Sequence, residues 1–373
     1  MKKLIHVAVG VIFDCSPAET GKILIAKRAD TQHQGGLWEF PGGKVEEGES
    51  VKIALKRELE EELGLQSKIE DMQPLITIPF HYSDKSVLLD VWKVYGAKLE
   101  LNQQATGIEG QPLAWVEESA LADYEFPTAN KAIIGALSLP TKIAITEDNS
   151  DPDIILAQAA QALKNYSNIW IQLRAPSLNQ MQYTQLAMKL YGICHEGGSK
   201  LIWNCPLDWY QIAFADGLHL SGLNYAEASS IKSSTHINIE NNKRPIPLTQ
   251  WLSMACHNLD ELEVAQELAD YILVSPVKET KTHPQANALT WSGFKVISEK
   301  SRIPCYALGG LEIVDICVSQ AHGGQGIAGI SCFNETAASK DITKNTKEST
   351  EEKNIENVED SIEVSNEEKS YEG

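Results

Sequence analysis

The sequence predicts an α/β protein in which two folded regions of different architecture precede an acidic tail. In residues 1–138, strand-like apolar runs are mixed with two helical stretches, which indicates an α/β domain. In residues 141–335, eight short apolar runs alternate with helical segments, which predicts a parallel (β/α)8 barrel of the TIM type. Residues 336–373 are rich in Glu, Lys, Ser and Asn with almost no large apolar side chains, so we expect a disordered tail.

The first region contains three runs typical of strands: His6–Phe13, Lys22–Ala26 and Ser86–Val94. A helical stretch follows near Asn130–Leu137, and Pro140 then breaks the pattern.

Residues 50–63 are predicted to form an amphipathic helix, because apolar side chains recur at every fourth position. These side chains are Val51, Leu55, Leu59 and Leu63. Ser50 can cap the start of the helix, and Gly64 lies where a left-handed C-terminal cap would end it.

Glu58, Glu61 and Glu62 lie on one side of this helix, beside its apolar stripe. Like charges at this spacing cost about 0.2–0.5 kcal/mol per pair, so a cation is expected nearby. A glycine-rich turn precedes the helix, and a divalent cation with a diphosphate needs both close backbone approach and fixed oxygen ligands. On the helix alone, a solvated acidic face remains an alternative.

The eight runs of the second region define the predicted barrel strands. They are Lys142–Thr146, Ile169–Leu173, Lys200–Trp203, Gly217–Leu220, Leu252–Ala255, Tyr271–Val274, Cys305–Leu308 and Gly326–Ile330. A polar insertion near Ser233–Asn242 lengthens one connection.

Composition narrows the classes of partner. The formal net charge of −19 argues against duplex nucleic acid or an anionic membrane, which need clustered Lys and Arg. The seven cysteines are scattered without a Cys-x-x-Cys pair, which is typical of reduced thiols in the cytoplasm. Residues 1–13 superficially resemble a signal peptide, but a first strand is the better interpretation. No run approaches the ~18 apolar residues of a membrane span.

The segment from Gly43 to Leu65 matches every position of Gly-x5-Glu-x7-Arg-Glu-U-x-Glu-Glu-x-Gly-U, where U is a bulky aliphatic residue. It resembles the signature of the Nudix hydrolases. The resemblance implies an α/β/α sandwich with a mixed sheet, and hydrolysis of nucleoside diphosphates linked to another group. The segment ILIAKRADTQHQGGLWEFPGG before it, with Glu109–Gln111 and Phe126–Asn130, extends the similarity to the MutT-type 8-oxo-dGTP diphosphatases over nearly all of residues 1–138.

This resemblance implies a catalytic centre that uses Mg2+, with Mn2+ as the alternative ion. Glu58 and Glu62 would bind the metal, and Glu61 would be a further ligand or the base. Arg57 would orient Glu58, and the backbone carbonyl of Gly42 would be another ligand. Glu109 matches a loop carboxylate that completes the metal and base machinery. Two plainer interpretations stay open: a surface ion pair between Arg57 and Glu58, and an ordinary turn residue at Glu109.

The resemblance also implies nucleotide contacts. Arg28 and His33 occupy positions that match contacts of the family, and Lys44 could hold a phosphate oxygen. Main-chain groups of Glu39 and Phe40 would add contacts, with Phe40 or Trp38 shaping the pocket. Pro41 and Gly42 belong to the same substrate-binding stretch. For each charged side chain, solvated surface charge is the alternative.

Asn130 is a candidate for base selection. Guanine oxidised at C8 presents an N7–H donor beside the O6 acceptor, whereas ordinary guanine presents two acceptors there. An Asn side chain offers one acceptor and one donor group and can pair with both. In a dry pocket, unmodified guanine would leave one group facing a like partner. A helix N-cap is the alternative role of Asn130.

Several segments of residues 141–334 resemble thiamine-phosphate synthase and the related TenI-like barrels. Candidate site residues of this second region are Gln172, Arg174, Asn204, His257, Lys281, Gly309, Gly310 and Ser331. The resemblance implies a phosphorylated ligand at the C-terminal face, gripped near Gly309, Gly310 and Ser331, with Lys281 as a further partner. His257 aligns with an acid or base of the thiazole tautomerases.

The second region departs from the synthase pattern at the magnesium–pyrophosphate site. Cys205 stands where an Asp is expected, and a cysteine is a poor magnesium ligand. A Lys expected after Arg174 is also missing, and so is an acidic residue after His219. The barrel is therefore a synthase, a tautomerase, or a phosphate-binding scaffold without catalysis.

The function expected from the sequence is Mg2+-dependent hydrolysis of 8-oxo-dGTP to the monophosphate and pyrophosphate, which removes a mutagenic nucleotide before DNA replication. Alternatives are a Nudix enzyme that prefers another nucleotide or a thiamine-pathway pyrophosphate, and a chain whose main enzyme is the barrel. A non-catalytic binding module would leave the complete motif unexplained.

Overall fold

The structure is a computed structural model of the 373-residue chain. It describes residues 4–15, 21–31, 34–81, 86–96, 107–221, 244–280 and 287–334. The chain divides into two compact units, residues 1–330 and 331–373. The described part of the second unit is the short helix α9 (Ser331–Asn334).

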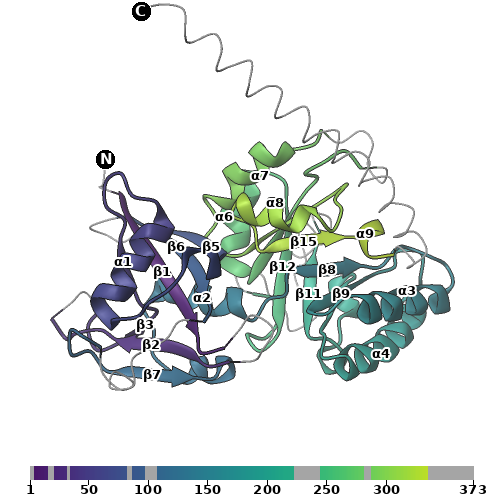
Figure 1. Ribbon diagram of the computed structural model, residues 1–373. Helices are drawn as coiled ribbons and strands as arrows, with labels where there is room; N and C mark the ends of the chain where they lie inside the picture. Colours follow the sequence, from purple (N-terminus) through teal and green to yellow (C-terminus); the bar gives the residue numbers. More distant parts are fainter. Residues whose placement is uncertain are drawn as a thin grey trace, which may run out of the picture. The chain divides into compact units, whose positions relative to one another are not determined.

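The first region is built on a seven-stranded mixed sheet (Figure 1). Its strands are β1 (Leu4–Phe13), β2 (Ile23–Lys27), β3 (Trp38–Glu39), β4 (Gly42–Lys44), β5 (Met72–His81), β6 (Ser86–Val94) and β7 (Leu113–Val116). The order is β3-β2-β1-β6-β5, with β4 paired to β1 and β7 paired to β2. β1 and β6 run parallel and the other pairs are antiparallel, which makes the sheet mixed.

Two helices cover opposite faces of this sheet: α1 (Val51–Leu63) and α2 (Thr128–Leu137). The stripe Leu55, Leu59 and Leu63 of α1 is fully buried with alternate residues of β1 such as Ala8. α2 buries its own stripe against residues of the other parity, such as Val9. Because successive strand side chains point to opposite faces, one sheet serves two cores. The predicted α/β/α sandwich is confirmed.

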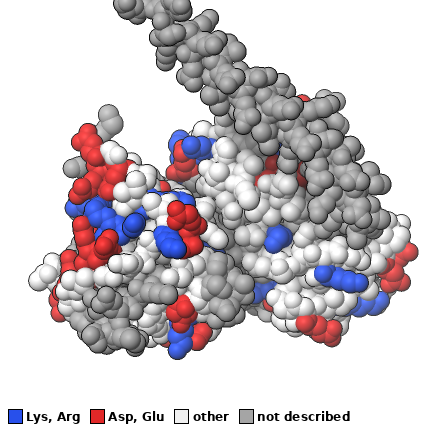
Figure 2. Space-filling view, in the orientation of Figure 1, with Lys and Arg blue, Asp and Glu red and all other residues white. Residues whose placement is uncertain are grey.

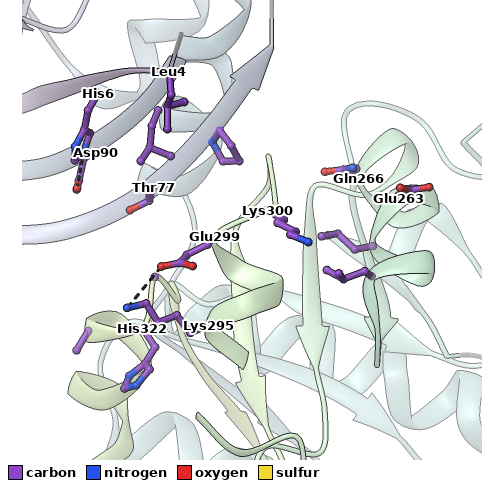
Figure 3. Close-up of a pocket in the computed structure, with 16 residues that line it drawn as sticks. Leu4, His6, Thr77, Asp90, Glu263, Gln266, Lys295, Glu299, Lys300 and His322 are labelled. Atoms are coloured by element: carbon purple, nitrogen blue, oxygen red, sulfur yellow. Dashed lines mark hydrogen bonds and ion pairs between the residues drawn. The ribbon is translucent and has the colours of Figure 1, made fainter. Parts of the chain in front are cut away.

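Charged pairs accompany both regions. In the first, the His6 imidazole lies 3.3 Å from the Asp90 carboxylate on the neighbouring strand, and Trp92 donates its indole N–H to the same carboxylate (2.9 Å). Burial raises the pKa of Asp90, while the His6 contact opposes the rise. Figure 3 shows His6 and Asp90 side by side. It also shows the pair of Lys295, in α7 (Thr290–Ser298), and Glu299, the residue after this helix, 3.6 Å apart.

The second region is a closed barrel of eight parallel strands in the order β10-β11-β12-β13-β14-β15-β8-β9. The strands are β8 (Lys142–Ile145), β9 (Ile169–Arg174), β10 (Leu201–Asn204), β11 (Gly217–Leu220), β12 (Trp251–Cys256), β13 (Tyr271–Val274), β14 (Cys305–Leu308) and β15 (Gly326–Gly329). Each lies within two residues of a predicted run at both ends. The predicted barrel is confirmed.

Helices separate the strands and cover the outside of the barrel (Figure 1). They are α3 (Pro152–Asn165), α4 (Gln180–Glu196), α6 (Leu259–Leu268), α7 (Thr290–Ser298) and α8 (Asp315–Ala321). The barrel interior packs aromatic side chains such as Trp170, Tyr271 and Tyr306 with aliphatic ones. Leu139, from the connection that precedes β8, is buried in the same cluster.

Some expectations fall outside the described residues. These are the disordered tail, the insertion near Ser233–Asn242, and the site candidates His33 and Lys281. The boundaries at residues 138, 141 and 335 stay predictions. Among the described helices, none has the length and apolar character needed to cross a bilayer.

Candidate functional site

The carboxylate helix α1 is fixed at both ends by the caps that its sequence predicts. The Ser50 hydroxyl accepts a hydrogen bond from the Ile53 amide (3.4 Å). Gly64 adopts φ +64°, and its N–H donates to the Glu60 carbonyl at 2.9 Å. Left-handed backbone is inexpensive for glycine, so the helix stops cleanly after Leu63. The position of each carboxylate along the helix is thereby set.

Two glycines bring the backbone of β4 against this helix and the sheet. A Cβ at Gly43 would lie 2.2 Å from the carboxyl carbon of Glu58, and one at Gly42 would lie 2.1 Å from the Ala8 carbonyl oxygen. Gly42 also has φ +145°, which an L side chain rarely adopts. The glycine pair is therefore required by close approach, and it places the Glu58 carboxylate directly on the turn.

Arg57 gathers the acidic side chains of the motif. Its guanidinium donates to Glu49 at 2.7 Å, to Glu58 at 2.9 Å and to Glu61 at 3.1 Å, and it also donates to the Lys44 carbonyl (3.1 Å). These contacts raise the pKa of Arg57, and the hydrogen bond to Glu49 contributes most to the rise. The same hydrogen bond lowers the pKa of Glu49. The cation expected beside the crowded carboxylates is thus partly supplied by the chain. Figure 2 shows acidic and basic side chains interleaved over the surface where α1 lies.

Unlike Glu58 and Glu61, the half-buried Glu62 is not among the described hydrogen-bond partners of Arg57. Burial raises the pKa of Glu62 to about 8, and the negative charges of Glu39, Glu58 and Glu109 contribute to the rise. The backbone of Gly42 partly opposes this rise. In such an environment the charged form of the carboxyl group is destabilised, and a nearby cation would stabilise it.

A cavity of about 330 Å³ opens next to Glu62. Its lining residues are Ala26, Lys27, Arg28, Ala29, Asp30, Glu39, Pro41, Glu62, Glu109, Gly110, Gln111 and Pro112. Five sequence-predicted site residues therefore meet in one pocket. Within it, Arg28 and Glu39 form a short, half-buried ion pair. Burial raises the pKa of Glu39, and Arg28 opposes that rise.

Other predicted site residues lie away from this cavity. Phe40 is 3% exposed and stacks on Phe126 with ring centroids 5.4 Å apart, so its side chain belongs to the core. Asn130 is half-buried on α2, against the face of the sheet opposite to α1. The helix starts at Thr128 with Pro127 as its N-cap, so the alternative role of Asn130 as a cap is wrong. Lys44 is exposed.

The donors near α1 suit Mg2+, which prefers oxygen ligands. Glu58 and Glu62 supply carboxylates, and the backbone of Gly42 is adjacent to Glu62. The crowding of Glu62 by other carboxylates is what a divalent cation would relieve. Within the described ranges, no three His, Cys, Asp or Glu side chains already stand as a metal-holding group. We therefore expect carboxylates to rotate when a cation binds.

Two residues with clear contacts in this site had no role assigned from the sequence. Glu49 is the glutamate of the Gly-x5-Glu spacing and makes the shortest contact to Arg57. Gln111 donates its amide to the Glu62 carbonyl at 3.1 Å. The segment Glu109–Gln111 already belonged to the similarity with the MutT-type enzymes, so the sequence did point to Gln111. The sequence alone does not show which backbone group the Gln111 amide contacts.

In the barrel, Gln172 and Asn204 are brought together near the carboxyl ends of adjacent strands. The Asn204 amide donates to the Gln172 side-chain oxygen at 3.2 Å, and Gln172 is 1% exposed. Arg174 ends the same strand as Gln172, and its backbone exchanges 2.9 Å hydrogen bonds with the Thr146 hydroxyl. These residues converge at the end of the barrel where ligands bind in this architecture.

The proposed phosphate grip lies in the loop after β14. Gly309 and Gly310 have φ +103° and +66°, and a Cβ at Gly310 would lie 2.3 Å from the Glu279 carbonyl oxygen. Only glycine fits both the conformation and the space. Ser331 opens α9 in the other compact unit and is exposed.

His257 lies in the loop after β12, where its ring nitrogen Nδ1 is 2.8 Å from Glu261. The backbone N–H of His257 donates to the same carboxylate, and Glu261 also takes part in the Asn258 cap of α6. Both side chains are roughly half exposed. The contact orients the imidazole, although the arrangement also stabilises the helix start.

The residues that stand at the expected magnesium–pyrophosphate positions do not fit that group. Burial raises the pKa of the Cys205 thiol to about 12, so it is neutral and a poor ligand. His219 is buried against the Ser253 hydroxyl (2.8 Å), and burial lowers its pKa to about 3. Gln172 and Asn204 are neutral as well. No reaction step through a metal follows from this set.

Comparison with protein families places both regions. The family model described as NUDIX domain matches residues 8–136. The model described as thiamine monophosphate synthase matches residues 143–333.

Individual relatives agree with this division. An 8-oxo-dGTP diphosphatase of Haemophilus influenzae is 38% identical over 136 residues, which cover 36% of this chain and 93% of the relative. A CTP pyrophosphohydrolase of Escherichia coli is 32% identical over 134 residues, 36% of this chain and 91% of the relative. A provisionally named thiamine-phosphate synthase 2 of Aquifex aeolicus is 28% identical over 200 residues, 53% of this chain and 100% of the relative.

The complete motif around α1, the two family matches and these relatives lead to one conclusion. The chain belongs to the Nudix family through its MutT-like first region and to the thiamine monophosphate synthase/TenI family through its barrel.

Proposed function

We propose that the first region hydrolyses 8-oxo-dGTP to 8-oxo-dGMP and pyrophosphate with Mg2+ as cofactor, and so removes an oxidised nucleotide before it enters DNA. The observation that carries this proposal is the folded motif: Glu58 rests on the Gly43 turn, and Glu62 faces a pocket shared with Arg28 and Glu109. The similarity to an 8-oxo-dGTP diphosphatase supports the choice of substrate.

The reaction balances with water as the only other reactant. The water oxygen bonds to the α- or β-phosphorus while the bond from that phosphorus to the oxygen that bridges the two breaks. The electron pair stays on the departing group, which is pyrophosphate for attack at the α-phosphorus and 8-oxo-dGMP for attack at the β-phosphorus. Bound Mg2+ would neutralise phosphoryl charge and acidify water. Glu58, Glu62 and the Gly42 carbonyl are its proposed ligands. Glu61 or Glu109 would take the proton.

Other residues of the first region, inside and outside this pocket, would hold the nucleotide. Arg28 is the cation placed to meet phosphate charge, and it is already inside the cavity beside Glu39. Lys44 and His33 stay candidate contacts. In this proposal the main-chain groups of Glu39 and Phe40 face the base, and the Asn130 amide reads the N7–H and O6 edge.

Base selection is tested by comparing kcat/KM for 8-oxo-dGTP and dGTP in the wild-type chain and in Asn130→Ala. We expect the wild type to prefer the oxidised nucleotide by about 10²-fold or more, because a mispaired buried amide costs a few kcal/mol. We expect Asn130→Ala to lose most of that preference. Equal rates for the two nucleotides in the wild type would refute the choice of substrate.

A second candidate substrate is supported by the CTP pyrophosphohydrolase relative. A thiamine-pathway pyrophosphate is favoured instead by the barrel that follows on the same chain. Adding CTP and hydroxymethylpyrimidine pyrophosphate to the assay separates the three substrates, since each leaves a different monophosphate. The substrate with the highest kcat/KM identifies the function of the first region.

For the barrel, the geometry around Gly309 and Gly310 supports a phosphorylated ligand, and the thiol of Cys205, where the resemblance expects an Asp, disfavours magnesium–pyrophosphate. A tautomerase with His257 as acid or base is therefore favoured over a synthase, with a scaffold as the third alternative. Proton exchange into a thiazole phosphate, compared between wild type and His257→Asn, tests the tautomerase. Exchange at equal rates in both would eliminate it.

A further inference from the structure

Glu109 lies in a tight turn whose geometry is closed by its own backbone. The Gly107 N–H donates to the Gln111 carbonyl at 2.8 Å, and the Gly110 N–H donates to the Gly107 carbonyl at 3.0 Å. Gly110 adopts φ +83°, which suits glycine at this position. The turn exposes the Glu109 side chain at its tip.

The turn is tied to the end of α1 by two hydrogen bonds to a single acceptor. The Gln111 side-chain amide donates to the Glu62 carbonyl at 3.1 Å, and the Ile108 N–H donates to the same oxygen at 2.9 Å. Glu62 is in the last turn of α1, where carbonyl groups have no partner within the helix. The Glu62 carbonyl therefore anchors the loop that carries Glu109.

Close packing holds the Gln111 side chain in this position. A Cβ at Gly107 would lie 2.4–2.6 Å from the carboxamide atoms of Gln111. On the other side, the Lys27 N–H of β2 donates to the Pro112 carbonyl at 2.9 Å. The loop is therefore held between α1 and the sheet. Glu62, Glu109 and Gln111 all line the same 330 Å³ cavity.

We infer that Gln111 is a positioning residue for the hydrolysis: its carboxamide fastens the 107–112 loop to the last turn of α1 and so holds Glu109 beside Glu62. This inference rests on the proposed function of the first region. Gln111 itself takes no proton and binds no metal. Its effect is transmitted through Glu109, and an error of about 1 Å in the placement of such a group can cost up to about 10²-fold in rate.

A double-mutant cycle in the full chain tests this role. The proteins are wild type, Gln111→Leu, Glu109→Gln and the double variant, assayed for kcat and KM with 8-oxo-dGTP at saturating Mg2+. We expect Gln111→Leu to lower kcat about tenfold or more with KM changed less than twofold. Because both changes act through one carboxylate, the double variant should be no slower than Glu109→Gln alone.

Two further measurements separate positioning from folding. Thermal melting of each variant reports loss of structure, and Gln111→Met replaces Gln111→Leu if the latter unfolds. Gln73→Leu, an exposed glutamine on β5, is the matched control and should leave kcat unchanged. Mn2+ titration of the proteins without substrate gives a readout that needs no turnover. Because the negative charge of Glu109 acts on the proposed ligand Glu62, we expect both Gln111→Leu and Glu109→Gln to weaken binding.

The outcomes distinguish the two levels of the proposal. An active wild type with unchanged kcat in Gln111→Leu, or with losses that add in the double variant, overturns the positioning role alone. A wild type that neither hydrolyses a nucleotide nor binds Mn2+ overturns the proposed function and this inference with it.

Discussion

The Glu62 side chain has an unusually high pKa for a carboxyl group. Burial and three neighbouring carboxylates raise the pKa of Glu62 to about 8, whereas Arg57 already neutralises part of the charge around Glu58. As a proposed metal ligand, Glu62 would bind a cation only as the carboxylate, so cation binding would displace the proton that this raised pKa favours near neutral pH.

This coupling makes magnesium affinity depend on pH. We expect the apparent affinity for Mg2+ to rise from pH 6 to about pH 8 and to level off above it, and we expect protons to be released on binding. Calorimetric titration in buffers of different ionisation enthalpy measures the number of protons released. An affinity that is flat across this range would show that Glu62 is not a ligand.

Substitution of Glu62 tests whether this residue has a specific role or only adds to the negative charge of α1. Glu62→Gln should lower kcat/KM by at least about 10²-fold, because one ligand and the charge that attracts the cation are both lost. Glu60→Gln removes a charge from the exposed side of α1 and serves as the matched control. Comparable losses in the two variants would contradict a specific role for Glu62.

His219 in the barrel supplies a second prediction that depends on pH. Burial lowers the folded-state pKa of His219 to about 3, so the unfolded chain binds a proton below about pH 6.5 that the folded chain does not. Stability should therefore fall as pH decreases through this window, by roughly 2 kcal/mol between pH 6.5 and 5 from this group. Urea unfolding of wild type and His219→Asn checks this, and the variant should show the shallower slope.

At the scale of elements, the turn from β4 into α1 connects glycine spacing to chemistry. Gly43→Ala would place a methyl group 2.2 Å from the Glu58 carboxyl carbon, so Glu58 must move. We expect at least about a tenfold loss of activity and weaker Mg2+ binding with the fold retained. Gly135→Ala in α2 is the matched control, because no described atom lies within 4 Å of the new Cβ. Normal activity of Gly43→Ala would mean that the close approach is dispensable.

The elements that the sequence predicts well are those whose own residues carry the signal. The fourfold apolar spacing and the caps Ser50 and Gly64 defined α1 almost to the residue. Long apolar runs defined β1 and β6 in the same way. The three-residue strand β4 was not predicted, because its pairing with β1 depends on distant residues. Pro74 and Pro79 obscured β5, where register shifts near the first of them.

The sequence predicted which residues belong to the candidate site better than it predicted the contacts among them. The motif placed Glu58, Glu62 and Arg57 on one helix, and the structure brings Arg28 and Glu109 to the same pocket as Glu62. The partners of Arg57 and the tether through Gln111 could not be inferred, because they depend on the path of loops after β4 and before β7. The expectation that the Phe40 side chain shapes the base pocket is wrong, because this side chain is buried in the core against Phe126.

At the scale of the whole molecule, the connection between the two regions is part of the barrel core. Leu139 is 4% exposed and packs with Trp170 and Tyr306, and the Tyr306 hydroxyl donates to the Pro140 carbonyl. Gln325 donates to the Ala136 carbonyl at 2.8 Å, near the end of α2. The residues that precede β8 therefore stabilise the barrel, although they lie before its first strand.

This packing predicts a stability effect from a residue outside the barrel strands. Leu139→Ala should destabilise the barrel by about 2–5 kcal/mol, because it leaves a cavity in a buried cluster. Leu248→Ala, at a residue that is 89% exposed, is the control and should change stability by less than about 0.5 kcal/mol. Urea unfolding midpoints provide the measurement. Equal midpoints for Leu139→Ala and wild type would show that the connection does not contribute.

Product analysis of the full chain with 8-oxo-dGTP, with Mg2+ and with a chelator, tests the proposed hydrolysis most directly. We expect one 8-oxo-dGMP and one pyrophosphate per substrate in the presence of Mg2+, and no turnover in the chelator. Absence of hydrolysis with Mg2+, undiminished hydrolysis in the chelator, or release of orthophosphate in place of pyrophosphate would contradict it.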